Sequence, residues 1–160
     1  MIFPAWLWIG MLAAANPCGP GDALCSCAGR VSPREQFERS DAVFRDVVVK
    51  VSRRREEYGP NQWYLRKRVV VRVVERWKGA EAATVVVRTG MGGGDCGYPF
   101  ERGREYLIYT RAAQNSELAT GICTRTNRIE HAGEDLRELR ALAPAAAAAV
   151  DLVTKKEAGR

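Results

Sequence analysis

The stretch "WYLRKRVVVRVVERW", residues 63–77, decides the fold class because valines recur at every second position within it. Val69, Val71 and Val73 alternate with residues 70, 72 and 74, two of which are also valine. Side chains of a β-strand point alternately to opposite faces, so one face of this segment is expected to be buried and the other partly wet. The segment therefore predicts a long strand that serves two faces of a sheet if it bends.

Four other segments have the same β-branched and aromatic character, and together they predict five strands. These segments are "DAVFRDVVVKV" (41–51), "ATVVVRT" (83–89), "REYLIYT" (104–110) and "ELATGICT" (117–124). Two stretches between them, "RRREEYGPNQ" (53–62) and "GMGGGDCG" (90–97), are predicted to be an exposed hairpin connection and a flexible glycine loop.

After the last strand, "GEDLRELRAL" (133–142) places Leu136, Leu139 and Leu142 at three-residue steps among charged residues. This spacing predicts an amphipathic helix that packs one apolar stripe on the sheet and ends before Pro144. Five strands and one closing helix in fewer than 130 residues favour a small closed barrel of the OB type over a seven-stranded sandwich. The expected fold is all-β, with a C-terminal helix.

The length of 160 residues suits a single domain with short terminal segments. The first 15 residues, "MIFPAWLWIGMLAAA", have no charged residue and end in small side chains, which is typical of an export signal. Cleavage after Ala15 or after Ala23 would fit small residues at the positions before the cut. We expect a signal peptide over 1–23 (or 1–15), a folded domain over 24–143, an alanine-rich flexible tail over 144–160, and secretion to an extracellular or periplasmic compartment. No stable membrane span is expected, since about 20 apolar residues are needed for one.

Cysteine spacing limits the disulfides that the chain could form. Cys25 and Cys27 are separated by one residue, so a bond between them would be strained. Each must then pair with one of the distant cysteines, Cys96 or Cys123, and both connectivities remain open from spacing alone. Cleavage after Ala23 would discard Cys18 and leave an even number. A zinc site is disfavoured because there is no Cys-x-x-Cys pair and His131 is the only histidine.

The order of these motifs resembles one known family. "CSC" (25–27) is followed by "SPREQFERSDAVFR" (32–45), then "DCG" (95–97), "REYLIY" (104–109) and "GICT" (121–124). Over residues 25–142 this order is similar to the N-terminal, netrin-like domain of the tissue inhibitors of metalloproteinases, in the form of a bacterial-type, single-domain homologue. The resemblance implies the netrin-like OB-fold barrel and the bonds Cys25–Cys96 and Cys27–Cys123, which would fasten the N-terminal segment to the barrel.

The resemblance also implies a function without catalysis. In the family, the backbone amine and carbonyl of the first cysteine chelate the catalytic zinc of a metalloendopeptidase, and the following side chain enters the specificity pocket. Carried across, the protease-binding residues are Cys25, Ser26, Cys27, Gly94 and Asp95, with the metal supplied by the target and no cofactor of the protein's own. Chelation requires that Leu24 be removed, because an amide nitrogen does not ligate zinc at neutral pH.

A second hypothesis comes from the charge, which is +6 overall and concentrated between residues 45 and 78. Aromatic residues are interleaved with the cations there, as in grooves that bind single-stranded nucleic acid. Export and disulfides disfavour nucleic acid and leave an anionic polysaccharide, an envelope surface or a protein as the partner of a non-inhibitory binding module. The alternative is an ordinary solvated hairpin. The candidate residues are Arg53, Arg54, Arg55, Arg66, Lys67 and Arg68, on the basic hairpin 50–68.

No arrangement of residues typical of an enzyme was found. The glycine loop lacks the Gly-Lys-Ser/Thr of a phosphate-binding loop, and His131 is expected to be a surface or helix-capping residue. The acidic pairs at 56–57 and 134–135 are expected to be exposed, with the second pair favouring a helix N-terminus.

Overall fold

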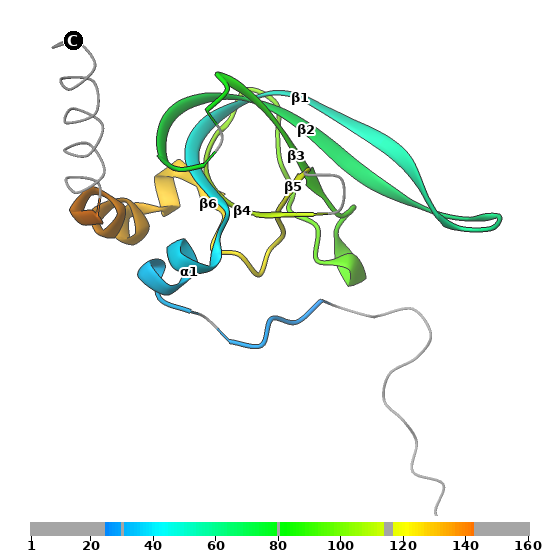
Figure 1. The fold of residues 1–160 in the computed structure, drawn as a ribbon, viewed down its shortest axis with the longest axis horizontal. Helices are drawn as coiled ribbons and strands as arrows, with labels where there is room; N and C mark the ends of the chain where they lie inside the picture. The colour runs from blue at the N-terminus through cyan, green and yellow to red at the C-terminus, as the bar shows by residue number, and fades with distance from the viewer. Residues whose placement is uncertain (1–24, 30, 80, 114–116, 143–160) are drawn as a thin grey trace, which may run out of the picture.

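The valine-rich segment lies within one long hairpin in the computed structural model, which describes residues 25–29, 31–79, 81–113 and 117–142. Strand β1 (Ala42–Gly59) pairs antiparallel with β2 (Gln62–Lys78) along almost its whole length. The sheet continues through β3 (Thr84–Thr89), β5 (Leu118–Ala119) and β4 (Glu105–Ala112). A further pairing of β1 with β4 closes these five strands into the ring seen in Figure 1.

The closed ring confirms the predicted five-stranded barrel, although its strands differ in length from the prediction. The segment 117–124 forms only the two residues of β5, and residues 121–124 are a turn. A short sixth strand that was not predicted, β6 (Asn127–Arg128), pairs with β4. The threonine hydroxyls of this region bond to one another, and that of Thr120 also donates to the backbone carbonyl of Tyr109 in β4.

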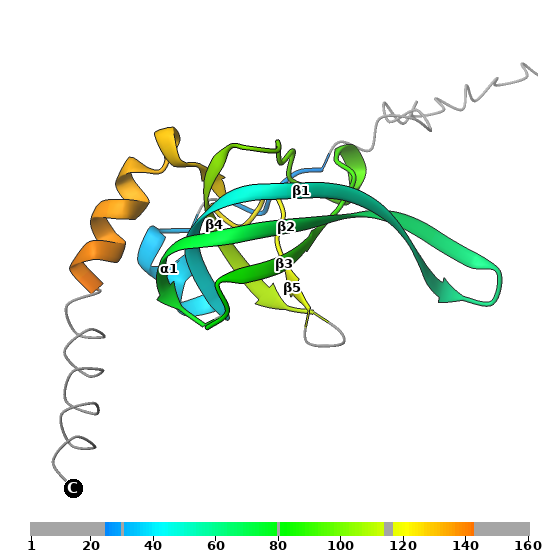
Figure 2. The same ribbon diagram turned by 90° about the horizontal axis from the view of Figure 1, so that it is seen from above.

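The predicted hairpin turn at Gly-Pro-Asn is confirmed, but the prediction that all of residues 53–62 form the connection was wrong, because both strands continue through the charged stretch up to that turn. Gly59 pairs with Gln62, and Asn61 between them has a positive φ of 58°, which asparagine tolerates better than most residues. The outer half of this hairpin, residues 52–68, is called the arm below. It projects beyond the barrel in Figure 2, and its charged residues are exposed or only partly buried, so charge does not oppose strand formation there.

Two apolar clusters hold the barrel together. The interior cluster includes Val69, Val71 and Val87 with Phe44 and Ile108, all fully buried. The valine alternation therefore marks the inner face, as predicted. The second cluster lies between the other face of β1 and β4 and the C-terminal helical segment 133–142, which buries Leu139 completely. Leu136 packs against the same cluster, as the leucine spacing indicated.

A short helix, α1 (Pro33–Arg39), which the sequence analysis did not predict, precedes β1. The Ser32 hydroxyl accepts a hydrogen bond from the backbone N–H of Glu35 at 3.2 Å, and proline occupies the start of the helix. Serine before proline is a helix-start signal that the sequence contained. Lys78 Nζ donates to the carbonyl oxygens of Phe37 and Glu38 near the end of α1, which ties the helix to β2.

Residues 1–24 and 143–160 lie outside the described residues, so the expected export signal and alanine-rich tail are not addressed by the structure. Among the described residues, no helix combines the length and hydropathy needed to cross a membrane.

Candidate functional site

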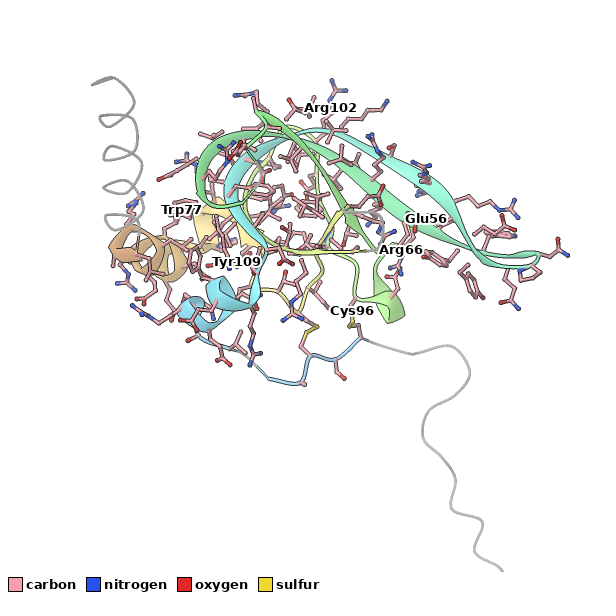
Figure 3. All side chains as sticks on the ribbon, viewed as in Figure 1. Glu56, Arg66, Trp77, Cys96, Arg102 and Tyr109 are labelled. Atoms are coloured by element: carbon pink, nitrogen blue, oxygen red, sulfur yellow. A yellow bond between two sulfur atoms is a disulfide. The ribbon has the colours of Figure 1, made fainter. Side chains whose placement is uncertain are left out.

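Two disulfides fasten the segment 25–29 to one end of the barrel. Cys25 is bonded to Cys96 and Cys27 to Cys123, with Cα–Cα distances of 5.2 and 5.4 Å. Figure 3 shows these sulfur atoms between the N-terminal segment and the barrel, beside the labelled Cys96. Ser26 and Cys27 are exposed on this end. This is the pairing that the family resemblance implies, and the two bonds suit an oxidising, extracellular environment.

The bonded cysteines are packed close together by the turn that precedes Cys123. The sulfur atoms of Cys25, Cys96 and Cys123 all lie within 4.8 Å of one another. The backbone N–H of Ile122 donates to the carbonyl oxygen of Cys96 at 3.0 Å. A Cβ on Gly121 would lie 2.6 Å from that same oxygen, so this approach requires glycine. Because each of these sulfurs is in a disulfide, Cys25 with Cys96 and Cys123 with Cys27, none of them is a thiolate available to a metal.

The side chain of Asp95 bonds to the backbone of its own glycine loop, residues 90–97. Its carboxylate accepts hydrogen bonds from the backbone N–H groups of Met91 at 2.6 Å, Gly92 at 2.8 Å and Gly97 at 3.2 Å. Its partial burial acts to raise the pKa of the carboxyl group, but these three bonds, together with the charge of Arg66, hold that pKa below its ordinary value. The expectation of a flexible loop is therefore corrected: the loop is held by one carboxylate.

The two ends of this loop lie close together, and the residues before Cys96 lie beside the N-terminal segment because Cys96 is bonded to Cys25. Gly90 and Gly97 are buried, and a Cβ on Gly97 would lie 2.2 Å from the backbone of Gly90. Between them, the 3-10 turn η1 (Gly93–Asp95) is exposed and leads directly into Cys96. The five predicted protease-binding residues thus lie at one end of the barrel. Asp95 offers its backbone there, since its carboxylate is engaged by the loop.

Arg125 holds the chain that follows the two N-terminal cysteines, a role that no sequence pattern indicated. Its guanidinium donates to Asp135 at two positions, both 2.8 Å, to Glu134 at 2.7 Å, and to the carbonyl oxygen of Val31 at 2.9 Å. Asp135 also accepts from the Tyr109 hydroxyl at 2.8 Å. These bonds raise the pKa of Arg125, while burial followed by the Asp135 bond raises that of Tyr109.

This network corrects the expectation that both acidic residues at 134–135 are exposed. Glu134 is exposed, but Asp135 is buried with 6 % of its surface accessible. Asp135 joins the helical segment 133–142 to β4 and to the turn after Cys123. His131 is exposed at the end of the turn η3 (Ile129–His131), which agrees with its predicted surface position.

The six predicted polyanion-binding residues do not form one patch, because the arm divides them between two faces. Arg54 lies opposite Arg66 and Ser52 opposite Arg68, so these three arginines share one face. Arg53 lies opposite Lys67 and Arg55 opposite Leu65 on the other face. Sequence proximity could not show this division, because the face follows from strand register.

Asp46 is a buried acidic residue that the sequence analysis did not identify. It is fully buried in β1 between Val73 and Tyr106 in the neighbouring strands, and neither carboxylate oxygen has a hydrogen-bond partner among the described residues. Burial, with a smaller contribution from the charge of Glu105, raises its pKa to about 8. The carboxyl group is therefore protonated at neutral pH.

The comparison with protein families agrees with this geometry. The family described as "Tissue inhibitor of metalloproteinase" matches residues 23–135, which is well over half of the chain. The chain belongs to this family. No match was found among curated proteins.

Family membership confirms the resemblance in the cysteine pattern and assigns a general function. Proteins of the tissue inhibitor of metalloproteinase family are inhibitors and not enzymes, so this protein is metalloproteinase-inhibitor-like and its expected partners are metalloproteinases. The matched region includes all four bonded cysteines and the loop closed by Asp95.

Proposed function

We propose that the protein inhibits a zinc metalloendopeptidase by presenting the backbone of Cys25 to the catalytic zinc of its target. The observation that carries the proposal is the pair of exposed segments, 26–29 and 92–95, held together by the disulfide between half-buried Cys25 and Cys96. A free α-amine and the carbonyl oxygen of the same residue form a five-membered chelate, and both atoms are neutral or weakly basic ligands that zinc accepts. Binding there would displace the water that the protease activates.

Rigid attachment supports this role. An inhibitor that inserts a chain end into an active site must avoid losing much conformational entropy on binding. The segment after Cys25 is tied by two disulfides and by the bond from Arg125 to Val31. Ser26, which is exposed, would then enter the specificity pocket, and Gly94 with the backbone of Asp95 would contact the rim of the cleft.

The mechanism requires that the mature chain begin at Cys25. We propose that an export signal over 1–23, or 1–15, is removed on secretion and that Leu24 is trimmed afterwards, leaving a domain that ends near residue 143. Mass spectrometry of the secreted protein tests this step, since it identifies the first residue directly. A mature chain that retains Leu24 would exclude chelation through Cys25.

The inhibitory mechanism is tested with two proteins that differ by one residue. One begins at Cys25, and the control carries a single alanine before Cys25, which converts the amine into an amide without changing the disulfides. We expect the first to inhibit the catalytic domain of a matrix metalloproteinase, and the second to bind at least about 100-fold more weakly because a zinc ligand is lost. Equal inhibition by both would reject chelation by the terminal amine. If neither inhibits, the proposed inhibitory function itself fails.

A second candidate function is a non-inhibitory binding module that uses the basic hairpin 50–68 on a polyanion or a protein. The projecting arm favours it, because its cations are carried on a two-stranded ribbon away from the barrel core. Retention of the protein on immobilised heparin that weakens with salt and is lost on replacing Arg53, Arg54 and Arg55 would support this function. Retention that is independent of salt would count against it.

A further inference from the structure

Four guanidinium groups lie side by side on one face of three neighbouring strands. Arg54 in β1 is opposite Arg66 in β2, and Arg68 in β2 is opposite Arg88 in β3. Residues directly opposite each other in antiparallel strands point to the same side of the sheet. Together with Glu56 and Glu117, these arginines line a small hollow at the base of the arm. Figure 3 shows Glu56 and Arg66 in this part of the hairpin.

The charges of this row, formed by Arg54, Arg66, Arg68 and Arg88, are only partly balanced. Arg88 binds both acidic residues, with distances of 3.1 Å to Glu56 and 3.5 Å to Glu117. No ion pair among the described residues includes Arg54, Arg66 or Arg68. The Nε atom of Arg66 is buried and has no hydrogen-bond partner within the described chain.

This arrangement costs stability unless an anion is bound. Like charges directly opposite each other in a sheet are destabilising, and the row contains two such pairs. A buried donor without a partner adds a further cost. Both costs are reduced by a ligand that brings negative charge and several acceptor oxygens to the same face.

We propose that this row is a binding site for sulfate or phosphate monoester groups carried by a linear polysaccharide. The planar fork of a guanidinium matches the oxygens of a tetrahedral oxyanion, and two N–H groups of one arginine bind it together. Adjacent strands are about 4.8 Å apart, so a row over three strands extends roughly 10 Å, which exceeds a single oxyanion. A chain with repeated anionic groups therefore fits the row better than a free ion.

This inference rests on the second candidate function above and specifies which face of the arm performs it. The other face also carries three cations, Arg53, Arg55 and Lys67, but they span only two strands. Arg55 there stacks over Trp63 with 3.7 Å from its guanidinium carbon to the ring centroid, and Arg66 of the row stacks over Tyr64 at 4.6 Å, so stacking does not distinguish the two faces. Lys67 also lines the hollow, so Arg53 and Arg55, together with the exposed Arg102 outside the arm, provide the matched control.

The test compares two triple variants with the same change in charge. One replaces the row, Arg54→Gln, Arg66→Gln and Arg68→Gln. The control replaces Arg53→Gln, Arg55→Gln and Arg102→Gln, because Lys67 lines the same hollow as the row. Binding of the full chain to dextran sulfate and to dextran phosphate of equal charge density is measured by titration calorimetry. We expect the row variant to lose at least about tenfold in affinity and the control to change by less than about threefold.

The outcomes separate this inference from the function on which it rests. An equal loss in both variants would show binding by general charge, which keeps the second candidate function and overturns the site. If neither polymer binds the unmodified protein, the second candidate function fails as well. Tighter binding of one polymer supports the site and identifies sulfate or phosphate as the group that it binds.

A further variant keeps the positive charges and removes only the guanidinium groups. It tests the site even if the glutamine variant fails to fold. Replacement of Arg54, Arg66 and Arg68 by lysine is expected to reduce affinity between about threefold and tenfold, because lysine binds oxyanions as a point charge. Affinity equal to that of the unmodified protein would overturn the proposed guanidinium recognition.

Discussion

The buried carboxyl group of Asp46 predicts a contribution to stability that is lost as the pH rises from about 4 to about 8. Asp46 is fully buried, and neither oxygen has a hydrogen-bond partner among the described residues. Its pKa is raised to about 8 in the folded protein, first by burial and then by the charge of Glu105. In the unfolded chain an aspartate has a pKa of about 3.9.

The sign and size of the effect follow from proton binding in the two states. Between these two pKa values the folded state holds a proton that the unfolded state releases, so raising the pH favours unfolding. The free energy of unfolding falls by about 1.4 kcal/mol for each pH unit across this window. From pH 4 to pH 7 the loss is about 4 kcal/mol, a large part of the roughly 5–15 kcal/mol typical of a folded domain.

Replacing Asp46 by asparagine removes this titration. We expect Asp46→Asn to gain stability relative to the unmodified protein as the pH rises, by about 3 kcal/mol between pH 5 and pH 7. The measurement is urea unfolding at both pH values, followed by tryptophan fluorescence with the disulfides intact. Because all other titrating groups are shared, the difference between the two proteins isolates Asp46.

The control is Glu81→Gln, which changes an exposed carboxyl group on the loop before β3. It measures how the same carboxyl-to-amide change at an exposed position alters stability at each pH. The reasoning is refuted if Asp46→Asn behaves like this control, since the folded carboxyl group would then titrate as it does in the unfolded chain.

Three further predictions concern the residues that position the N-terminal segment. Asp95→Ala removes the acceptor of three backbone hydrogen bonds and is expected to lower the free energy of unfolding by about 1–3 kcal/mol, with Asp95→Asn closer to the unmodified protein, both measured by urea unfolding. Arg125→Ala leaves buried Asp135 without its charged partner, so thermal unfolding should show a loss of about 3–5 kcal/mol; an unchanged melting temperature would contradict this. Replacing Cys27 and Cys123 together by alanine opens a loop with a sequence separation of 96, and calorimetry is expected to show a loss of roughly 4–5 kcal/mol, whereas a loss below about 1 kcal/mol would mean that the bond does not restrain the unfolded chain.

Local patterns predicted the barrel well where burial repeats along the chain. Val69 and Val71 face the interior, and Leu136 and Leu139 pack on the outer cluster, because side-chain direction follows the strand or helix period. The same reasoning failed on the arm. Charged residues between 53 and 59 suggested a connection, yet they extend a strand, since a ribbon exposed on both faces needs no apolar alternation.

The candidate protease-binding residues were found through the order of the cysteines, a signal that survives in sequence because covalent bonds fix the spacing of the fold. The order of the cysteines did not predict the direction in which each side chain points. Asp95 was expected to flank the protease, but its carboxylate turns into its own loop to satisfy backbone N–H groups. Arg125 and Asp46 carried no local pattern, because their surroundings are built from strands and turns distant in the sequence.

The sequence by itself determined the all-β fold, the inner face of the barrel and the family, since each depends on local periodicity or on the order of a few cysteines. Only the tertiary structure decided which cations share a face, that Asp46 is enclosed without a partner, and that Asp95 holds its own loop. These properties depend on strand register and on contacts between distant segments. A shift of one residue in the register of the arm would exchange its two faces and leave the sequence unchanged.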